Sequence, residues 1–344
     1  MRALEIEATN HCNTCCLHCP REAITRPMGM MTWDVFRTVV DRILECEHID
    51  AVDFSGMGEP TLNPLLPRFV GYLSERLPTY LTTNAATLTT AKIEELLDAG
   101  LDYAIISFNG FDGETYAQMM GRLSLETVTQ NIRNLVDKGS AKIQVIANTS
   151  VTRQTREHLP EIKTYLGNLG ISNVFFSQCH NRGGYLTDYS VCDTVVPATE
   201  CGRCDIFTST HFVAWNGELL ACCHDLRGDG LIGSLITENP SMVLARKRRI
   251  SERGVGFQMC ENCNDMQRFS LDQTPDGTSL SEWIYSLYTG EDARTTKLIE
   301  TIRHQQERIQ ELEESLRARE SGRRVRITSR VKRLLGITGG SPRT

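Results

Sequence analysis

The sequence has no long hydrophobic run, and no stretch approaches the length of a membrane-spanning helix. Positive charge is not in excess, since 37 Lys and Arg residues face 43 Asp and Glu residues and the net charge is −6. This balance argues against nucleic-acid binding by the chain as a whole. The first residues form a strand-like pattern and lack the basic and apolar segments of a secretory signal. We therefore expect a cytoplasmic protein, with enough chain for one large and one smaller domain.

Cysteine, in contrast, is abundant, with 13 residues in 344. Without a secretory signal, these cysteines are not expected to form a disulfide framework. In a reducing compartment, closely spaced cysteines are typical of metal or cluster ligands. Their spacing is therefore the main indicator of function.

Residues 1–180 alternate short apolar strands with amphipathic helices. Such alternation predicts parallel strands joined by right-handed crossovers. The expected fold is α/β, a partial (β/α)6 barrel related to the TIM barrel, with its active site at the C-terminal ends of the strands. The expected strands are 4–8, 51–55, 79–83, 103–108, 142–148 and 173–177, and the expected helices are 33–46, 65–76, 90–99, 125–138 and 155–169.

The rest of the chain divides into four further segments. Residues 181–199 resemble a linker, and 200–275 form a small loop-rich unit that holds a second group of cysteines. Residues 280–320 have a heptad-like helical pattern, and 321–344 form a basic tail. The tail is either a solvated segment, an amphipathic helix on anionic lipid or a contact for a partner.

Three cysteines on one short loop directly follow the first strand. Cys12, Cys16 and Cys19 have the spacing C-x3-C-x2-C. Three thiolates can bind three irons of a [4Fe–4S] cluster and leave the fourth iron open, whereas a structural cluster uses four cysteines. Cys15 also forms a C-x-x-C pair with Cys12, so a zinc loop or a redox pair is the alternative.

The cysteine loop resembles that of the radical S-adenosylmethionine (SAM) superfamily. Three later strand ends resemble the family's motifs in the same order along the chain: Gly56-Met57-Gly58-Glu59-Pro60, Thr83-Asn84-Ala85 and Ser107-Phe108-Asn109-Gly110. The resemblance implies that the open iron chelates the amino and carboxylate groups of SAM. Reductive cleavage then gives methionine and a 5′-deoxyadenosyl radical, which abstracts a substrate hydrogen atom. An electron donor such as flavodoxin or ferredoxin is implied as well.

The same resemblance implies the residues that bind SAM. Gly58 and Glu59 correspond to residues that meet the SAM amino group, and Arg122 to an arginine that pairs with the SAM carboxylate. Asn109 stands where relatives have an acid, which removes a charge. The complete implied set is Gly58, Glu59, Asn84, Ser107, Asn109 and Arg122.

The second cysteine group resembles the auxiliary-cluster domains of the SPASM and twitch types. Its spacing around a predicted Asn216-Gly217 hairpin turn implies one further [4Fe–4S] cluster. The implied ligands are Cys204, Cys222, Cys260 and Cys263, with Cys201 and Cys223 as alternative ligands. A structural zinc site made from the same thiolates is the other interpretation.

Two single cysteines are candidates for hydrogen-atom donors to a substrate radical. Cys179 follows the sixth expected strand, and Cys192 lies in the linker. Strand ends face the active site in this fold, although a buried bystander thiol is the simpler interpretation for each.

The resemblance to radical SAM dehydrogenases with a short auxiliary domain implies oxidation of a polar substrate, a sugar-like or aminocyclitol-like alcohol. A small-molecule or glycan-type substrate is therefore expected, and nucleic acid is not. Radical epimerisation of a sugar or peptide and maturation of a ribosomal peptide are the enzymatic alternatives. A zinc-binding scaffold is the alternative without catalysis.

Overall fold

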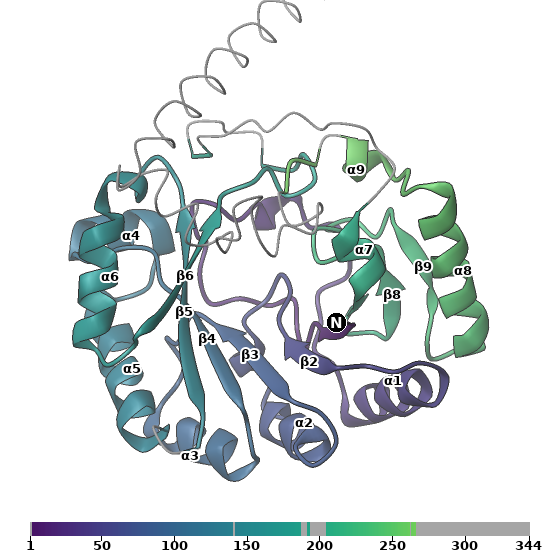
Figure 1. The fold of residues 1–344 in the computed structure, drawn as a ribbon, viewed down its shortest axis with the longest axis horizontal. Coiled ribbons are helices and arrows are strands. Elements are labelled where there is room, and N and C mark those ends of the chain that lie inside the picture. Colours follow the sequence, from purple (N-terminus) through teal and green to yellow (C-terminus); the bar gives the residue numbers. More distant parts are fainter. Residues whose placement is uncertain (1, 140–141, 187–190, 193–203, 262, 266–344) are drawn as a thin grey trace, which may run out of the picture. The chain divides into compact units, whose positions relative to one another are not determined.

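The structure is a computed structural model that describes residues 2–139, 142–186, 191–192, 204–261 and 263–265 (Figure 1). The predicted helical segment 280–320, the basic tail, Cys201 and most of the predicted linker lie outside the described residues. None of the described helices is both long and apolar enough to cross a membrane.

One sheet organises the described part of the chain, in the strand order β6-β5-β4-β3-β2-β1-β7-β8-β9. All neighbours from β6 to β7 pair in parallel, and β8 and β9 add antiparallel strands at one edge. The strands are β1 (Ala3–Ile6), β2 (Ala51–Phe54), β3 (Thr79–Thr83), β4 (Tyr103–Ser107), β5 (Gln144–Val151), β6 (Asn173–Gln178), β7 (Thr210–Val213), β8 (Glu218–Leu220) and β9 (Leu231–Ser234).

The longer helices lie on the outer side of the curved sheet (Figure 1). They are α1 (Trp33–Cys46), α2 (Leu66–Leu73), α3 (Thr90–Asp98), α4 (Gly113–Met120), α5 (Leu125–Gly139), α6 (Leu159–Asn168) and α8 (Pro240–Arg253), with the short α7 (Asp205–Ser209) and α9 (Gln258–Glu261) near the second cysteine group. Thr32, Thr89 and Asp112 each accept a backbone N–H bond at a helix start, which satisfies groups that the helix leaves free. The α/β partial barrel expected from the sequence is confirmed.

Each strand presents one face to the helices and one to the inner side of the sheet. Leu4, Ile6 and Phe54 are fully buried in the core beneath the helices. The alternate residues Glu5 and Asp53 face the other way, and they are paired across β1 and β2. The outer face is therefore apolar, whereas the inner face carries charged and polar side chains.

The sheet continues into the segment that holds the second cysteine group. The sequence predicts a six-unit partial barrel followed by a small loop-rich unit, and strand β7 of that unit pairs in parallel with β1, from Ala3↔Thr210 to Ile6↔Val213. Strand β1 would otherwise be a sheet edge with unpaired backbone groups. Strand β7 satisfies those groups, so the sheet runs without a break into the hairpin β7–β8, whose turn contains Gly217 at φ 83°.

Candidate active site

The loop after β1 places three cysteine thiols together. Cys12, Cys16 and Cys19 are partly exposed free thiols, while Cys15 is exposed. Burial, followed by the neighbouring Cys19 and Cys12 thiols, raises the pKa of Cys16 to about 12. Three mutually repelling thiols in a sheltered loop are costly to ionise without a cation. Iron supplies that compensation, so the loop fits the cluster predicted from its spacing.

Helix α4, which the sequence analysis did not predict, supports this loop. The backbone N–H of Leu17 donates to the Met119 carbonyl oxygen over 2.9 Å, and the Thr14 hydroxyl donates to the Met120 carbonyl oxygen. Gly121 follows the helix at φ 65°, and a Cβ there would lie 2.6 Å from the Cys15 carbonyl oxygen. The approach of helix and loop therefore requires glycine at this position.

The motif after β2 lies directly against the cysteine loop. The Glu59 N–H donates to the His11 carbonyl oxygen over 2.8 Å, and a Cβ on Gly58 would overlap the carbonyl oxygens of Thr9 and His11. The Glu59 carboxylate is buried, and it accepts bonds from the Thr83 hydroxyl over 2.7 Å and from the Asn84 N–H over 2.8 Å. Burial raises its pKa, although these bonds oppose the shift. Glu59 thus ties the ends of β2 and β3 together, and its contact with SAM stays a prediction.

Asn84 continues this network toward the cysteines, because its side-chain amide donates to Asn13 Oδ1 over 2.7 Å. Asn109 is buried and connects two strands: its Oδ1 accepts from the Ser150 N–H over 2.6 Å. Its side-chain amide also donates to Met120 Sδ over 3.2 Å, a bond that a carboxylate could not make, which gives a local reason for Asn at this position. Ser107 is partly exposed at the end of β4, and Arg122 is exposed after α4. The predicted contacts of Ser107 and Arg122 with SAM stay predictions.

The second group of cysteines assembles from three separate segments. Cys204 precedes α7, Cys222 follows β8, and Cys260 and Cys263 lie in and after α9. Burial raises the pKa of Cys222 well above its usual value, and the nearby Cys263, Cys260 and Cys204 thiols raise it further. Cys222 therefore interacts electrostatically with the other three cysteines of the predicted ligand set, whereas Cys223 contacts Glu5.

A buried lysine, Lys247, accompanies these four thiols. Burial lowers the pKa of Lys247 to about 7, while Cys222 acts in the opposite direction. Its ammonium donates to the Thr210 carbonyl oxygen and lies 3.1 Å from His211 Nδ1. A positive charge is stabilised here when the thiols carry negative charge, as they do in a metal or iron–sulfur site. The four thiols, with Lys247 beside them, therefore fit a metal or iron–sulfur site.

Cys179 and Cys192 are brought together, which the sequence analysis did not foresee. They form a disulfide across 13 residues and pack against Leu17 of the cysteine loop. In this state neither sulfur carries a hydrogen atom. The hydrogen-donor role of Cys179 and Cys192 therefore stays a prediction that requires the reduced thiols.

Comparison with known protein families identifies a domain in the first part of the chain. Residues 6–166 match the family model of the Radical SAM superfamily. This chain contains a radical SAM domain.

Similarity to individual proteins is distant. A cofactor-modifying protein for tungsten-containing aldehyde ferredoxin oxidoreductase from Pyrococcus furiosus is 26% identical over 182 residues, 52% of this chain and 51% of that protein. The S-adenosyl-L-methionine-dependent 2-deoxy-scyllo-inosamine dehydrogenase of Niallia circulans is 27% identical over 108 residues, 30% of this chain and 43% of that protein. The matched region thus spans about half the length of these relatives or less.

The solved structure of BtrN in complex with AdoMet and 2-DOIA has a similar fold. Its TM-score is 0.56 at 19% identity, over 77% of this chain and 94% of that chain. This likeness covers a larger part of the chain than residues 6–166. At this identity it establishes the fold alone.

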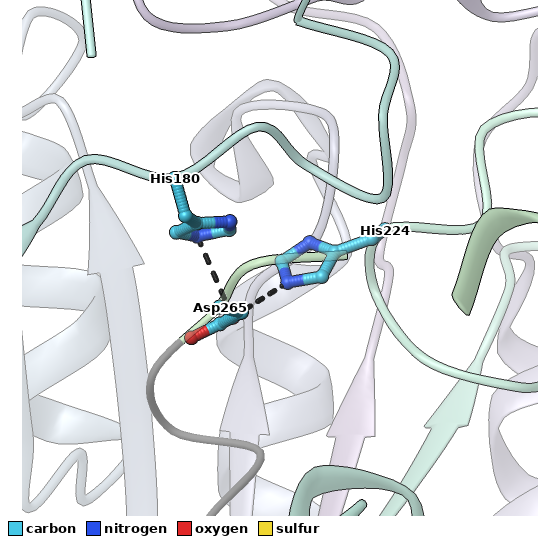
Figure 2. A group of neighbouring side chains, drawn as sticks. All are labelled: His180, His224 and Asp265. Carbon is cyan, nitrogen blue, oxygen red and sulfur yellow. Dashed lines mark hydrogen bonds and ion pairs between the residues drawn. The ribbon is translucent and has the colours of Figure 1, made fainter. Parts of the chain in front are cut away.

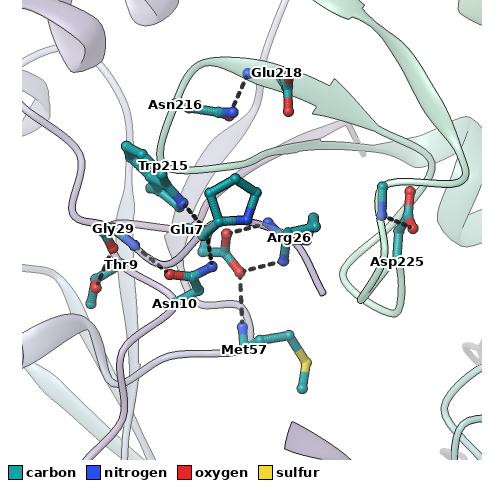
Figure 3. Close-up of polar contacts among 12 residues, drawn as sticks. Glu7, Thr9, Asn10, Arg26, Gly29, Met57, Trp215, Asn216, Glu218 and Asp225 are labelled. Atoms are coloured by element: carbon teal, nitrogen blue, oxygen red, sulfur yellow. Dashed lines mark hydrogen bonds and ion pairs between the residues drawn. The ribbon is translucent and has the colours of Figure 1, made fainter. Parts of the chain in front are cut away.

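A buried ion pair anchors the cysteine loop of the radical SAM domain (Figure 3). The Arg26 guanidinium donates two bonds to the Glu7 carboxylate, over 2.8 and 2.9 Å, and both side chains are buried. The Trp215 indole N–H donates to the Pro27 carbonyl oxygen over 3.0 Å. These contacts join the segment after the cysteine loop to β1 and to the β7–β8 turn.

The sequence analysis missed two acids on the inner face. The Glu5 carboxylate accepts from the Ser55 hydroxyl over 2.7 Å. Burial, and then the charge of Asp53, raises the pKa of Glu5 to about 7, and burial raises that of Asp53 to about 6. The signal was present, because each acid alternates with two buried apolar residues, as in Leu4-Glu5-Ile6 and Val52-Asp53-Phe54.

Proposed function

We propose that this radical SAM protein oxidises a polar, sugar-like alcohol and carries two [4Fe–4S] clusters, one for SAM and one auxiliary. The observation that carries the substrate class is the polar inner face of the sheet. Glu5, Asp53, Thr82, Ser107 and Asn148 occupy inward positions of β1 to β5, so this face offers hydrogen-bonding groups that match the hydroxyl groups of a polar substrate better than an apolar surface.

The chemistry divides between the cofactor and the chain. Cys12, Cys16 and Cys19 would hold the cluster that binds SAM, and SAM, reduced by an external donor such as flavodoxin or ferredoxin, would supply the radical chemistry for hydrogen-atom abstraction. The chain must hold the substrate C–H bond in place and accept the hydroxyl proton that alcohol oxidation releases. Glu5, with a pKa of about 7, is suited to accept a proton near neutral pH.

Two observations support oxidation in particular. Cys204, Cys222, Cys260 and Cys263, of which Cys222 interacts electrostatically with the other three, offer a ligand set for an auxiliary cluster, which would accept the second electron. The Niallia circulans relative is named as a dehydrogenase that depends on S-adenosyl-L-methionine. Cys179 and Cys192 are not required for this reaction, since oxidation returns no hydrogen atom to the substrate.

Iron, acid-labile sulfide and 5′-deoxyadenosine test the cofactor assignment. After anaerobic reconstitution, we expect about eight iron and eight sulfide per chain, from two cubes of four. Replacement of Cys12, Cys16 and Cys19 by Ala should remove about half of the iron and abolish 5′-deoxyadenosine formation. The matched variant Cys222→Ser/Cys260→Ser should also lose half of the iron, yet retain SAM cleavage. Retained cleavage in the triple variant, or full zinc occupancy of the second group, would contradict the assignment.

Product analysis in deuterated water tests the reaction. With 2-deoxy-scyllo-inosamine as the first probe, oxidation yields a ketone and no solvent deuterium at an inverted carbon. Cys179→Ala and Cys192→Ala should retain turnover. An inverted, deuterated product, lost in either variant, would establish epimerisation in place of oxidation.

A further inference from the structure

Three side chains from distant segments converge outside the cysteine groups (Figure 2). His180 follows β6, His224 directly follows Cys222 and Cys223, and Asp265 follows α9. One ligand atom from each lies within 4.8 Å of those of the other two. His224 and Asp265 are buried, and His180 is partly buried.

The carboxylate lies between the two imidazole rings. His224 Nε2 is 2.8 Å and His180 Nε2 is 3.5 Å from the same oxygen, Oδ2 of Asp265. The two ring centroids are 4.6 Å apart. The longer distance exceeds that of a good hydrogen bond, so hydrogen bonding to Asp265 does not account for the position of His180.

Two hydrogen bonds between Asn181 and Asn264 hold together the segments that carry His180 and Asp265. The Asn181 N–H donates to Asn264 Oδ1 over 2.7 Å, and the Asn264 N–H donates to Asn181 Oδ1 over 3.3 Å. Each asparagine is the immediate neighbour of one member of the group. Metal sites depend on this kind of support, because ligands must be positioned before the ion binds.

We infer that His180, His224 and Asp265 bind one divalent transition-metal ion of the type that imidazole prefers, for which Zn²⁺ is the representative. Two imidazole nitrogens and one carboxylate oxygen are a recurrent ligand set for Zn²⁺ and Fe²⁺. Three protein ligands leave at least one coordination position for water or for an oxygen of a bound substrate. The location supports such a role, because His180 lies just beyond the C-terminal end of β6.

The neighbours of the ring nitrogens of His180 and His224 determine which nitrogen carries the proton. His224 Nε2 lies 2.8 Å from Asp265 Oδ2, so it can bind a metal only when the ring proton is on Nδ1, which lies 3.9 Å from Cys223 Sγ. The Arg182 N–H donates to His180 Nδ1 over 3.3 Å. Binding of a metal at His180 Nε2 therefore requires the ring proton to move to Nδ1, with loss of this long and weak bond.

The site is chemically separate from both cysteine groups, since it offers nitrogen and oxygen in place of sulfur. It also does not depend on SAM cleavage or on the proposed oxidation. Its presence can be tested on protein whose cysteines are already occupied by reconstituted clusters.

The experiment adds ZnCl₂ to the full chain after anaerobic reconstitution, removes excess zinc by desalting, and combines metal analysis with X-ray absorption at the zinc edge. We expect one zinc per chain with a nitrogen and oxygen shell at about 2.0–2.1 Å. A sulfur shell at about 2.3 Å would mean that zinc occupies cysteines, and it would overturn the proposal, as would the absence of retained zinc.

His224→Gln and Asp265→Asn should each lower retained zinc at least tenfold, because they remove one ligand but preserve polarity and size. His48→Gln is the matched control: His48 lies 3.1 Å from Asp50 in an exposed pair, and its loss should leave zinc unchanged. If circular dichroism shows that a variant does not fold, the zinc coordination shell measured in the wild-type protein still tests the proposal. If SAM is not cleaved although zinc binds through nitrogen and oxygen, the proposed function fails and the metal site stands.

Discussion

The two cysteine groups are built in opposite ways. Cys12, Cys16 and Cys19 lie within eight residues on one loop, so local chain geometry places them. Cys204, Cys222, Cys260 and Cys263 come from three segments and meet only after β7, β8, α8 and α9 have packed. The first group is a local motif held by contacts to its neighbours, whereas the second is a product of the tertiary fold. The two groups should therefore respond differently to changes elsewhere.

Loss of the Glu7–Arg26 ion pair should have the largest effect on stability, and it should affect both groups. Arg26→Met leaves a buried carboxylate without its partner, which costs about 3–5 kcal/mol. We expect a lower free energy of unfolding in urea and less iron at both sites. Glu94→Gln is the control, since its exposed pair with Lys138 contributes about 1 kcal/mol or less. An equal effect of the two variants would contradict the anchoring role of the buried pair.

Titration of Glu5, on the inner face of the sheet, should make the free energy of unfolding depend on pH even when both cysteine groups are free of clusters. The pKa of Glu5 is raised in the folded state, from 4.5 to about 7, so the folded protein binds more protons than the unfolded chain between these values. Stability should accordingly fall as the pH rises from about 4.5 to about 7, by at most about 3 kcal/mol from this group.

Glu5→Gln should flatten this part of the stability profile, measured by urea unfolding of the cluster-free chain. Glu22→Gln, at an exposed acid, is the control and should leave the profile unchanged. A wild-type profile that rises across the same window would show that Glu5 is not the controlling group.

A methyl group at Gly29 should weaken the contact between the two regions. A Cβ there would lie 2.5 Å from the Trp215 ring, so the segment after the cysteine loop must move away from the β7–β8 turn. We expect Gly29→Ala to cost about 1–3 kcal/mol and to lower the melting temperature. Gly113→Ala is the control, because no atom lies within 4 Å of a Cβ in the first turn of α4. Melting temperatures that fall equally would argue against a specific steric effect.

Replacement of Cys15 should have the smallest effect. Cys15 is exposed, whereas Cys12, Cys16 and Cys19 are partly sheltered. Cys15→Ser should therefore retain iron content and 5′-deoxyadenosine formation at wild-type levels. Loss of about four iron would instead indicate that Cys15 is a ligand, and the local motif would need to be reassigned.

Several elements were predictable because their signals are local. Helix α1 and strand β3 have the predicted bounds, since apolar periodicity and a threonine cap mark the helix and turn residues bound the strand. The helix expected at 155–169 begins instead at Leu159, with Pro160 in its first turn, where proline is tolerated. Helix α4 was missed because its eight residues make only about two turns, too few for an apolar periodicity to be recognised.

The sequence by itself determined the cysteine loop, the strand–helix alternation and the order of the strand-end motifs, because each depends on residues close together in the chain. Only the tertiary structure decided that β7 pairs with β1, that Cys179 meets Cys192, and that His180, His224 and Asp265 converge. The physical reason is that these contacts join segments 13 to more than 200 residues apart. Such contacts follow from covering a sheet edge and burying a shared core, and no local spacing encodes them.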